Sequence, residues 1–111
     1  MTLTKETKKH IKQRSSYYWN KYGLNEDNIE DMFIECKMAC QICKKPFTSD
    51  GVNKCNVDHC HKTEKIRGLL CTRCNTGLGF FEDNPYTLLS AIRYVLKHAD
   101  LKTFNEMKVG S

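Results

Sequence analysis

The sequence lacks any segment that could cross a membrane. No apolar run approaches the roughly 20 residues that a transmembrane helix needs. The longest apolar cluster, residues 86–96, is interrupted by Thr87, Ser90 and Arg93. The first 14 residues also lack the apolar core of a secretory signal peptide, so we expect an intracellular, cytoplasmic protein. There is no internal repeat and no low-complexity linker, and 111 residues therefore predict a single domain.

Seven cysteines are many for so short a chain. A secreted protein would use them in disulfides, but without a signal peptide we expect reduced thiols that bind metal. Cys40 and Cys43 form one CxxC pair, and Cys71 and Cys74 form a second pair beyond residues 44–70. Two such pairs are typical of a tetrahedral zinc site. Because four thiolates leave no position for water or substrate, this Zn²⁺ is predicted to be structural.

The remaining cysteines have other predicted places. Cys36 continues an apolar stripe at helical spacing with Ile29, Met32 and Phe33, so it is expected in the core. Another possibility is a second zinc site, for which the candidate ligands are Cys55, Cys60, His59 and His61. This alternative is the weaker one, because the spacing matches no zinc knuckle and the histidines have a better use.

The formal charge of +5 is unevenly placed. Residues 1–21 carry six cations against one acid, residues 22–36 carry five acids and no cation, and residues 37–75 carry eight cations against three acids. Two basic zones therefore flank an acidic helix, which is compatible with a nucleic-acid partner. Lysines that simply form a solvated surface are the alternative, so charge alone is weak support.

Periodicity and capping residues predict the elements. We expect a basic helix over residues 5–21 that Gly23 ends, and an acidic helix from the N-cap Asn25 to about Cys36. Short strands and turns follow, with residues 66–70 as the clearest strand. Asn84 caps a last clear helix, and residues 101–111 form a short helix or a frayed tail. The core face of that last helix is predicted to consist of Leu88, Leu89, Ile92, Val95 and Leu96.

Between the CxxC pairs lies a constellation suited to catalysis. Asp58, His59 and His61 precede a turn and a strand, and Asn75 directly follows the last zinc ligand. A hard cation such as Mg²⁺ takes one or two oxygen ligands from protein, and Asp58 and Asn75 offer that pair. A neutral imidazole beside them can accept a proton from water. Ideal strand alternation would point Asp58 and His59 to opposite faces, so the strand must bend or end there.

Three segments carry a resemblance to a known family. Residues 58–63 (DHCHKT), 67–71 (RGLLC) and 74–79 (CNTGLG) are similar to the signature of the phage recombination endonuclease VII family, and the similarity extends over roughly residues 17–98. It implies a small α+β fold with a zinc-stapled ββα-metal core, also called the His-Me finger of HNH-type nucleases, and flanking helices. It also implies Mg²⁺ or Mn²⁺ on Asp58 and Asn75, His59 as general base and His61 as a further active-site histidine.

This resemblance divides the single domain into three parts. Residues 1–37 hold the basic and the acidic helix, residues 38–80 the zinc-bound nuclease core, and residues 81–111 the C-terminal helix and tail. If the gene belongs to a phage, the expected compartment is the host cytoplasm. A homodimer is compatible with the sequence but is not implied by it.

The predicted function is metal-dependent hydrolysis of DNA phosphodiester bonds, with branched or nicked duplex as candidate substrates. One alternative is a nicking or homing-type HNH endonuclease that acts on ordinary duplex. The other is a zinc-ribbon module that binds nucleic acid without turnover. Candidate contacts to the DNA backbone are the cationic residues Lys8, Lys9, Lys12, Arg14, Arg67 and Arg73.

Overall fold

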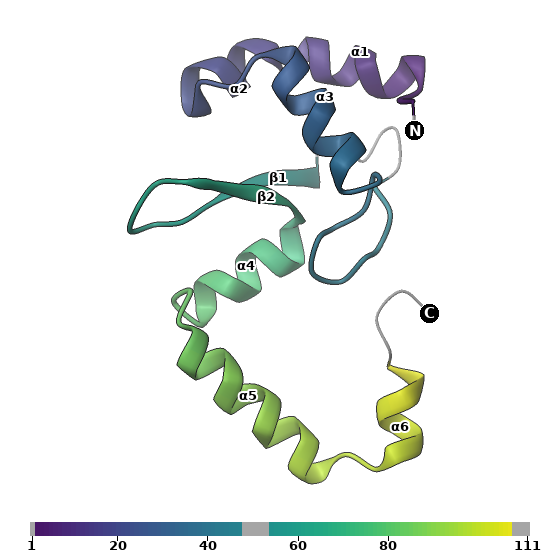
Figure 1. The fold of residues 1–111 in the computed structure, drawn as a ribbon, viewed down its shortest axis with the longest axis vertical. Coiled ribbons are helices and arrows are strands. Elements are labelled where there is room, and N and C mark those ends of the chain that lie inside the picture. The colour runs from purple at the N-terminus through teal and green to yellow at the C-terminus, as the bar shows by residue number, and fades with distance from the viewer. Residues whose placement is uncertain (1, 48–53, 108–111) are drawn as a thin grey trace.

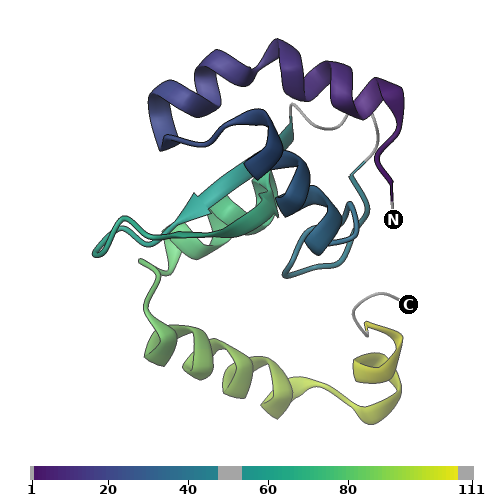
Figure 2. The same cartoon turned by 45° about the horizontal axis from the view of Figure 1, so that its top comes forward.

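Six helices and one two-stranded sheet make up the described part of the chain, residues 2–47 and 54–107, in this computed structural model (Figure 1). The sheet is a hairpin with α1, α2 and α3 on one side and α4 on the other (Figures 1 and 2). In chain order the elements are α1 (Lys5–Gln13), α2 (Ser15–Tyr22), α3 (Glu26–Glu35), β1 (Cys55–His59), β2 (Ile66–Cys71), α4 (Thr72–Phe80), α5 (Pro85–His98) and α6 (Leu101–Glu106).

The basic N-terminal segment forms two helices, although the sequence predicted one. The break falls at Arg14, whose φ of −105° and ψ of 9° are not helical and whose N–H donates to both His10 O and Ile11 O. A serine pair, residues 15–16, follows at once. Such pairs are a common cause of helix kinks. Gly23 ends α2 in the left-handed region at φ 67°, as its position predicted.

The acidic helix α3 follows the prediction closely. The Asn25 side chain accepts from the backbone N–H of Asn28, and the Asn28 side chain accepts from the backbone N–H of Asn25. This reciprocal pair satisfies two donors at the helix start. Ile29 and Phe33 are fully buried, and Cys36 packs against the core as expected. One apolar stripe therefore docks α3 on α1 and on the hairpin.

The hairpin and α4 form the ββα unit that positions the site. β1 pairs antiparallel with β2, and the register is Asp58 opposite Gly68 but His59 opposite Ile66. Arg67 is therefore the extra residue of a β-bulge. The bulge confirms that regular pairing fails between Asp58 and His59. α4 follows β2 without a linker, so the small α+β fold has the predicted ββα core with flanking helices.

Both C-terminal helices form where the sequence predicted them, but the surroundings of α5 differ from the prediction. The face of α5 that was expected to be buried is largely exposed: Leu89 45%, Ile92 55%, Val95 55% and Leu96 47%. The reason is the turn after α4, which sends α5 away from the hairpin (Figures 1 and 2). α6 covers the first residues of the predicted C-terminal tail, and residues 108–111 lie outside the described residues.

Within residues 2–47 and 54–107, no helix is both long enough and apolar enough to cross a membrane.

Candidate functional site

The four CxxC cysteines come together as the sequence predicted. Their sulfur atoms all lie within 4.8 Å of one another, and Cys43 Sγ is 3.9 Å from Cys71 Sγ. Sulfurs that bind one Zn²⁺ tetrahedrally at about 2.3 Å lie about 3.8 Å apart, so the spacing fits. Cys40 and Cys43 come from the loop after α3, Cys71 ends β2 and Cys74 lies in the first turn of α4. The cluster could hold a structural metal such as zinc.

The titration behaviour of the thiols also fits a dication. Burial tends to raise the pKa of Cys40, but hydrogen bonds from the backbone of Cys71, Cys43 and Ile42 lower it to about 6. The pKa of Cys74 is raised instead, first by burial and then by the neighbouring sulfurs. Neighbouring sulfurs therefore oppose one another's ionisation, and a divalent metal would favour it because thiolates, not thiols, are the ligands.

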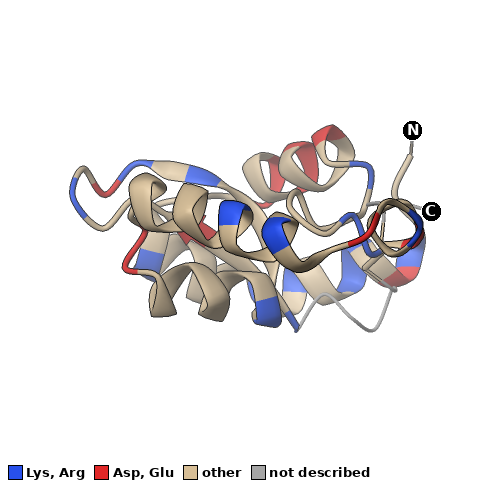
Figure 3. Cartoon of the chain, turned by 90° about the horizontal axis from the view of Figure 1, so that it is seen from below, with Lys and Arg blue, Asp and Glu red and all other residues tan. Residues whose placement is uncertain are grey.

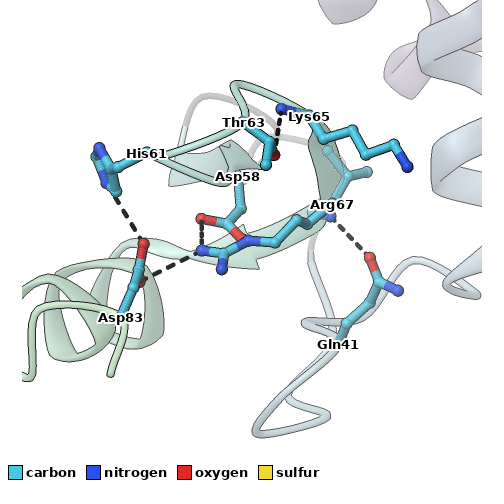
Figure 4. A network of polar contacts seen from close by, with 8 residues as sticks. Gln41, Asp58, His61, Thr63, Lys65, Arg67 and Asp83 are labelled. Atoms are coloured by element: carbon cyan, nitrogen blue, oxygen red, sulfur yellow. Dashed lines mark hydrogen bonds and ion pairs between the residues drawn. The ribbon is translucent and has the colours of Figure 1, made fainter. Parts of the chain in front are cut away.

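A glutamine inside the first CxxC pair fixes its loop to the hairpin. Gln41 Oε1 accepts from the backbone N–H of Leu69 at 2.8 Å (Figure 4). A Cβ on Gly68 would collide with the Gln41 side chain, so the glycine allows this close approach. The contact brings the first pair of cysteines to the second pair, and it explains why glycine precedes the two buried leucines of β2.

A second zinc site from the remaining cysteines is incompatible with their placement. Cys55 begins β1 and is buried in the core, whereas Cys60 follows the end of the same strand. Five residues of strand span roughly 16 Å, which is too far for one metal to bind both thiols. Burial raises the pKa of Cys55, as expected for a core thiol.

Asp58 is held inside the hairpin by an arginine. Its side chain is only 8% exposed, and its carboxylate accepts two hydrogen bonds from Arg67, from Nε at 2.6 Å and from Nη2 at 3.0 Å (Figure 4). The bulge at Arg67 places the guanidinium there. Hydrogen bonding to Asp58 raises the pKa of Arg67 above its already high usual value, so the guanidinium stays charged.

The two histidines lie close together at the end of the hairpin. The ring centroids of His59 and His61 are 4.9 Å apart, and the Tyr22 ring centroid lies 6.3 Å from that of His59. His59 lines an open cleft of about 320 Å³ with Lys21 and Tyr22 from the end of α2. His61 is exposed and lies on the side of Asp83, at 3.7 Å between Nε2 and Oδ2. The two histidines therefore line different clefts, and the cleft that His61 lines also contains Arg67 and Asp83.

Asn75 is placed by the cysteine cluster. It directly follows Cys74 in α4, and Cys74 N–H donates to Cys71 Sγ at 3.4 Å, which fixes the first turn of the helix. α4 packs against both strands of the hairpin (Figure 1). Asp58 and Asn75 thus lie on neighbouring elements of one ββα unit, and Asn75 is half-buried.

The predicted DNA contacts are spread over several elements. The three lysines of α1 and Arg73 of α4 are exposed, and Arg14 lies over the rings of Tyr17 and Tyr18. In the ribbon of Figure 3, acidic positions gather on α3, whereas basic positions occur on most other elements. Arg67 differs from the other candidates, since two carboxylates engage its guanidinium. The three exposed lysines of α1 among these candidates are Lys8, Lys9 and Lys12.

Sequence reasoning missed three residues at this site. Lys21 lines the His59 cleft, Gln41 fixes the zinc loop, and Asp83 binds Arg67 from the turn before α5. The position of Gln41 within a CxxC pair was its only signal in the sequence. Nothing in the sequence pointed to Asp83, because its partner Arg67 lies in β2 and the whole of α4 separates the two residues along the chain.

Comparison with known proteins decides the family. The family model for recombination endonuclease VII matches residues 13–97. The chain belongs to the recombination endonuclease VII family. The Gene 59 proteins of Mycobacterium phages L5 and D29 are each 34% identical to it over 100 residues, which cover 84% of this chain and 59% of either relative. The chain thus spans about three-fifths of the length of these relatives. No solved structure shows a significant match.

The resemblance to this family implied a catalytic cation, and two side chains of the ββα unit carry oxygen atoms of the kind that would hold one. Asp58 and Asn75 offer a carboxylate and an amide oxygen, which are hard ligands suited to Mg²⁺ or Mn²⁺. A carboxylate has about four acceptor directions, and Arg67 uses two of those of Asp58. The pair with Arg67 therefore uses about half of the acceptor directions of Asp58.

Proposed function

We propose that this protein is a metal-dependent endonuclease that hydrolyses phosphodiester bonds of DNA. One observation carries the proposal: the buried Asp58 and the half-buried His59 lie at the bulged end of a hairpin, and this hairpin leads through the cysteine cluster directly into the helix that bears Asn75. In this arrangement oxygen ligands for a cation and an imidazole base belong to one rigid unit. Family membership supports the same activity.

Each residue of the unit has a role in the proposed reaction. An imidazole nitrogen of His59 takes the proton from a water molecule that attacks phosphorus, since a neutral imidazole is a base near neutral pH. Asp58 and Asn75 hold the cation. A bound Mg²⁺ or Mn²⁺ supplies a Lewis acid that stabilises the charge on the phosphate and on the leaving oxygen. His61, exposed beside His59, orients the phosphate.

The cysteine cluster acts on stability rather than on chemistry. Zn²⁺ bound by four thiolates has no open position for substrate. Its task in this proposal is to fix the start of α4, and with it Asn75, relative to the hairpin. Losing the zinc would therefore abolish cutting indirectly.

DNA approaches the hairpin end from the side of α2. Lys21 and Tyr22 share the cleft with His59, so a phosphate near this base would lie within reach of the lysine. The exposed lysines of α1 are further candidates for phosphate contacts on the N-terminal helices. Such contacts position the duplex without reading its sequence.

The rival from another class is a zinc-ribbon module that binds nucleic acid without turnover. It gives no reason to bury a carboxylate beside two histidines, since an exposed basic surface is sufficient for binding. Within the nucleases, a nicking or homing-type HNH enzyme shares this site and differs in substrate. The geometry of the site therefore favours catalysis over binding alone.

A plasmid assay tests the proposal. Zinc-loaded protein is mixed with supercoiled plasmid in Mg²⁺, in Mn²⁺, or after brief addition of EDTA, and circular dichroism checks that the fold is unchanged. We expect nicked circles with either metal, none with EDTA, and recovery when Mg²⁺ is restored. Intact plasmid in every metal, with DNA binding retained, would favour the zinc-ribbon module instead.

A further inference from the structure

Asp83 occupies an unusual place for a carboxylate. It lies in the turn between α4 and α5, where Glu82 and Asp83 both adopt left-handed backbone conformations, with φ of 57° and 55°. Its side chain is 15% exposed, and Oδ2 is buried without a hydrogen-bond partner among the described residues. Left-handed conformations are uncommon for residues with a side chain and are kept where the surroundings require them. The turn therefore directs this carboxylate inward at a cost.

The carboxylate is directed at the residues of the nuclease site. Asp83 Oδ1 accepts from Arg67 Nη2 at 3.3 Å, and Oδ2 lies 3.7 Å from His61 Nε2 (Figure 4). The same Nη2 also donates to Asp58 at 3.0 Å. One guanidinium nitrogen thus bridges the buried carboxylate of the hairpin and the carboxylate of the turn.

Two anchors restrict a guanidinium more than one does. Arg67 is a bulged residue at the hairpin surface, and its side chain is 37% exposed. With Asp58 as its only partner, the planar group could rotate about its Nε contact or turn to a phosphate of the substrate. Asp83 accepts a second hydrogen bond from Nη2 and so keeps Nε and Nη2 of Arg67 directed at Asp58. Partners that orient a metal-binding carboxylate in this way tune the site without touching the metal.

We propose that Asp83 is a positioning residue of the nuclease site, which holds the Arg67 guanidinium against Asp58 from the turn between α4 and α5. Its catalytic consequence rests on the proposed nuclease function, whereas the contact itself does not. In the proposal Asp83 sets the direction of the Asp58 oxygens, and thereby the affinity of the cation and the rate of cutting, but not the affinity for DNA.

The test compares three variants with the parent protein in its zinc-loaded form. Asp83→Ala removes the carboxylate, and Asp83→Asn keeps its size while removing the charge. Glu82→Ala is the matched control, because Glu82 is the exposed neighbour in the same turn with a similar backbone conformation. Three quantities are measured: water exchange of the Arg67 Nε–H by nitrogen-15 NMR, Mn²⁺ affinity by electron paramagnetic resonance, and the single-turnover rate of plasmid nicking.

Loss of Asp83 should loosen Arg67 and weaken the site. In Asp83→Ala we expect faster exchange of the Arg67 Nε–H, and a loss of roughly 10- to 100-fold in Mn²⁺ affinity or cutting rate, the usual effect of removing an orienting partner. DNA affinity should change less than about twofold, since the carboxylate contributes no phosphate contact. Asp83→Asn should fall between Asp83→Ala and the parent. Glu82→Ala should match the parent.

The outcomes separate the two proposals. If the parent cuts no DNA in any metal, the nuclease function fails, but the Arg67 exchange rate still tests the positioning role. If Asp83→Ala and Asp83→Asn match Glu82→Ala in exchange rate and Mn²⁺ affinity, the positioning role is wrong even in an active enzyme. Should Asp83→Ala unfold, Asp83→Asn decides alone: parent-like exchange overturns the proposal, and faster exchange in a folded protein supports it.

Discussion

Removing the metal from the cysteine cluster should unfold the protein rather than leave it folded and inactive. The perturbation is the joint change Cys40→Ser and Cys43→Ser, which deletes one CxxC pair. In residues 38–47, all of which are described, only Cys40 and Phe47 are buried, and α4 buries no side chain. Little apolar burial therefore holds the zinc loop or α4 against the hairpin.

The expected effect exceeds the stability of the whole domain. Structural zinc contributes roughly 10–16 kcal/mol of apparent binding free energy in zinc-dependent folds. A domain of this size has a free energy of unfolding of roughly 5–15 kcal/mol in total. We therefore expect the double variant to lack zinc and to show no cooperative thermal transition. Prolonged treatment with a strong chelator, long enough to strip the zinc, should do the same to the parent, unlike the brief addition of EDTA in the plasmid assay.

The assay combines elemental analysis with circular dichroism during heating. Cys36→Ser is the matched control, because Cys36 Sγ donates to Phe33 O at 3.5 Å outside the cluster and a hydroxyl can replace it. This control should keep one zinc per chain and a cooperative transition. The reasoning is refuted if the metal-free protein still unfolds cooperatively, or if the double variant retains its zinc.

Three further predictions concern the surface, the core and the zinc loop. Alanine at the three exposed lysines of α1 should weaken DNA binding and flatten its salt dependence by up to about one unit of slope per lost contact; unchanged slopes in fluorescence anisotropy would mean that this helix faces away from DNA. The joint change Ile92→Glu and Leu96→Glu should alter the free energy of unfolding by less than about 0.5 kcal/mol, since both positions are exposed. A larger loss of stability in urea denaturation would mean that α5 packs against the core. Gly68→Ala should cost up to about 1–3 kcal/mol, because its Cβ would displace the Gln41 side chain from the Leu69 N–H. Gln41→Ala in the same chain should add little to that loss, and additive losses in a double-mutant cycle would contradict this contact. The three lysines of α1 to be changed to alanine are Lys8, Lys9 and Lys12.

Local signals in the sequence were sufficient for much of the fold. Asn25 and Asn84 cap the helices that they were predicted to cap, and Gly23 ends α2, because capping depends on a few neighbouring backbone groups. The two CxxC pairs met as predicted because tetrahedral ligation requires a fixed spacing of sulfurs. Where one residue and its neighbours determine the geometry, the sequence is informative.

Features that depend on distant elements were not accessible in this way. The apolar stripe of α5 has the pattern of a core face, but the turn at residues 81–84 decides whether it meets the core, and it does not. The break at Arg14 interrupts a pattern that a single helix satisfies equally well. Asp83 pairs with Arg67 although the whole of α4 separates them along the chain. The bulge that places Arg67 on Asp58 changes the strand pairing without changing the hydrophobic pattern of the sequence.

Substitution of His59 by alanine tests the central claim most directly. The zinc-loaded variant and parent are compared in single-turnover nicking of plasmid with Mg²⁺, with zinc content, thermal unfolding and DNA affinity measured on the same samples. The account predicts that His59→Ala cuts roughly 10²- to 10⁴-fold more slowly, because a general base contributes that much to rate and little to binding. Excess Mn²⁺ should partly rescue Asp58→Ala, which weakens the cation site, but not His59→Ala. A His59→Ala protein that nicks plasmid at the parent rate would contradict the account.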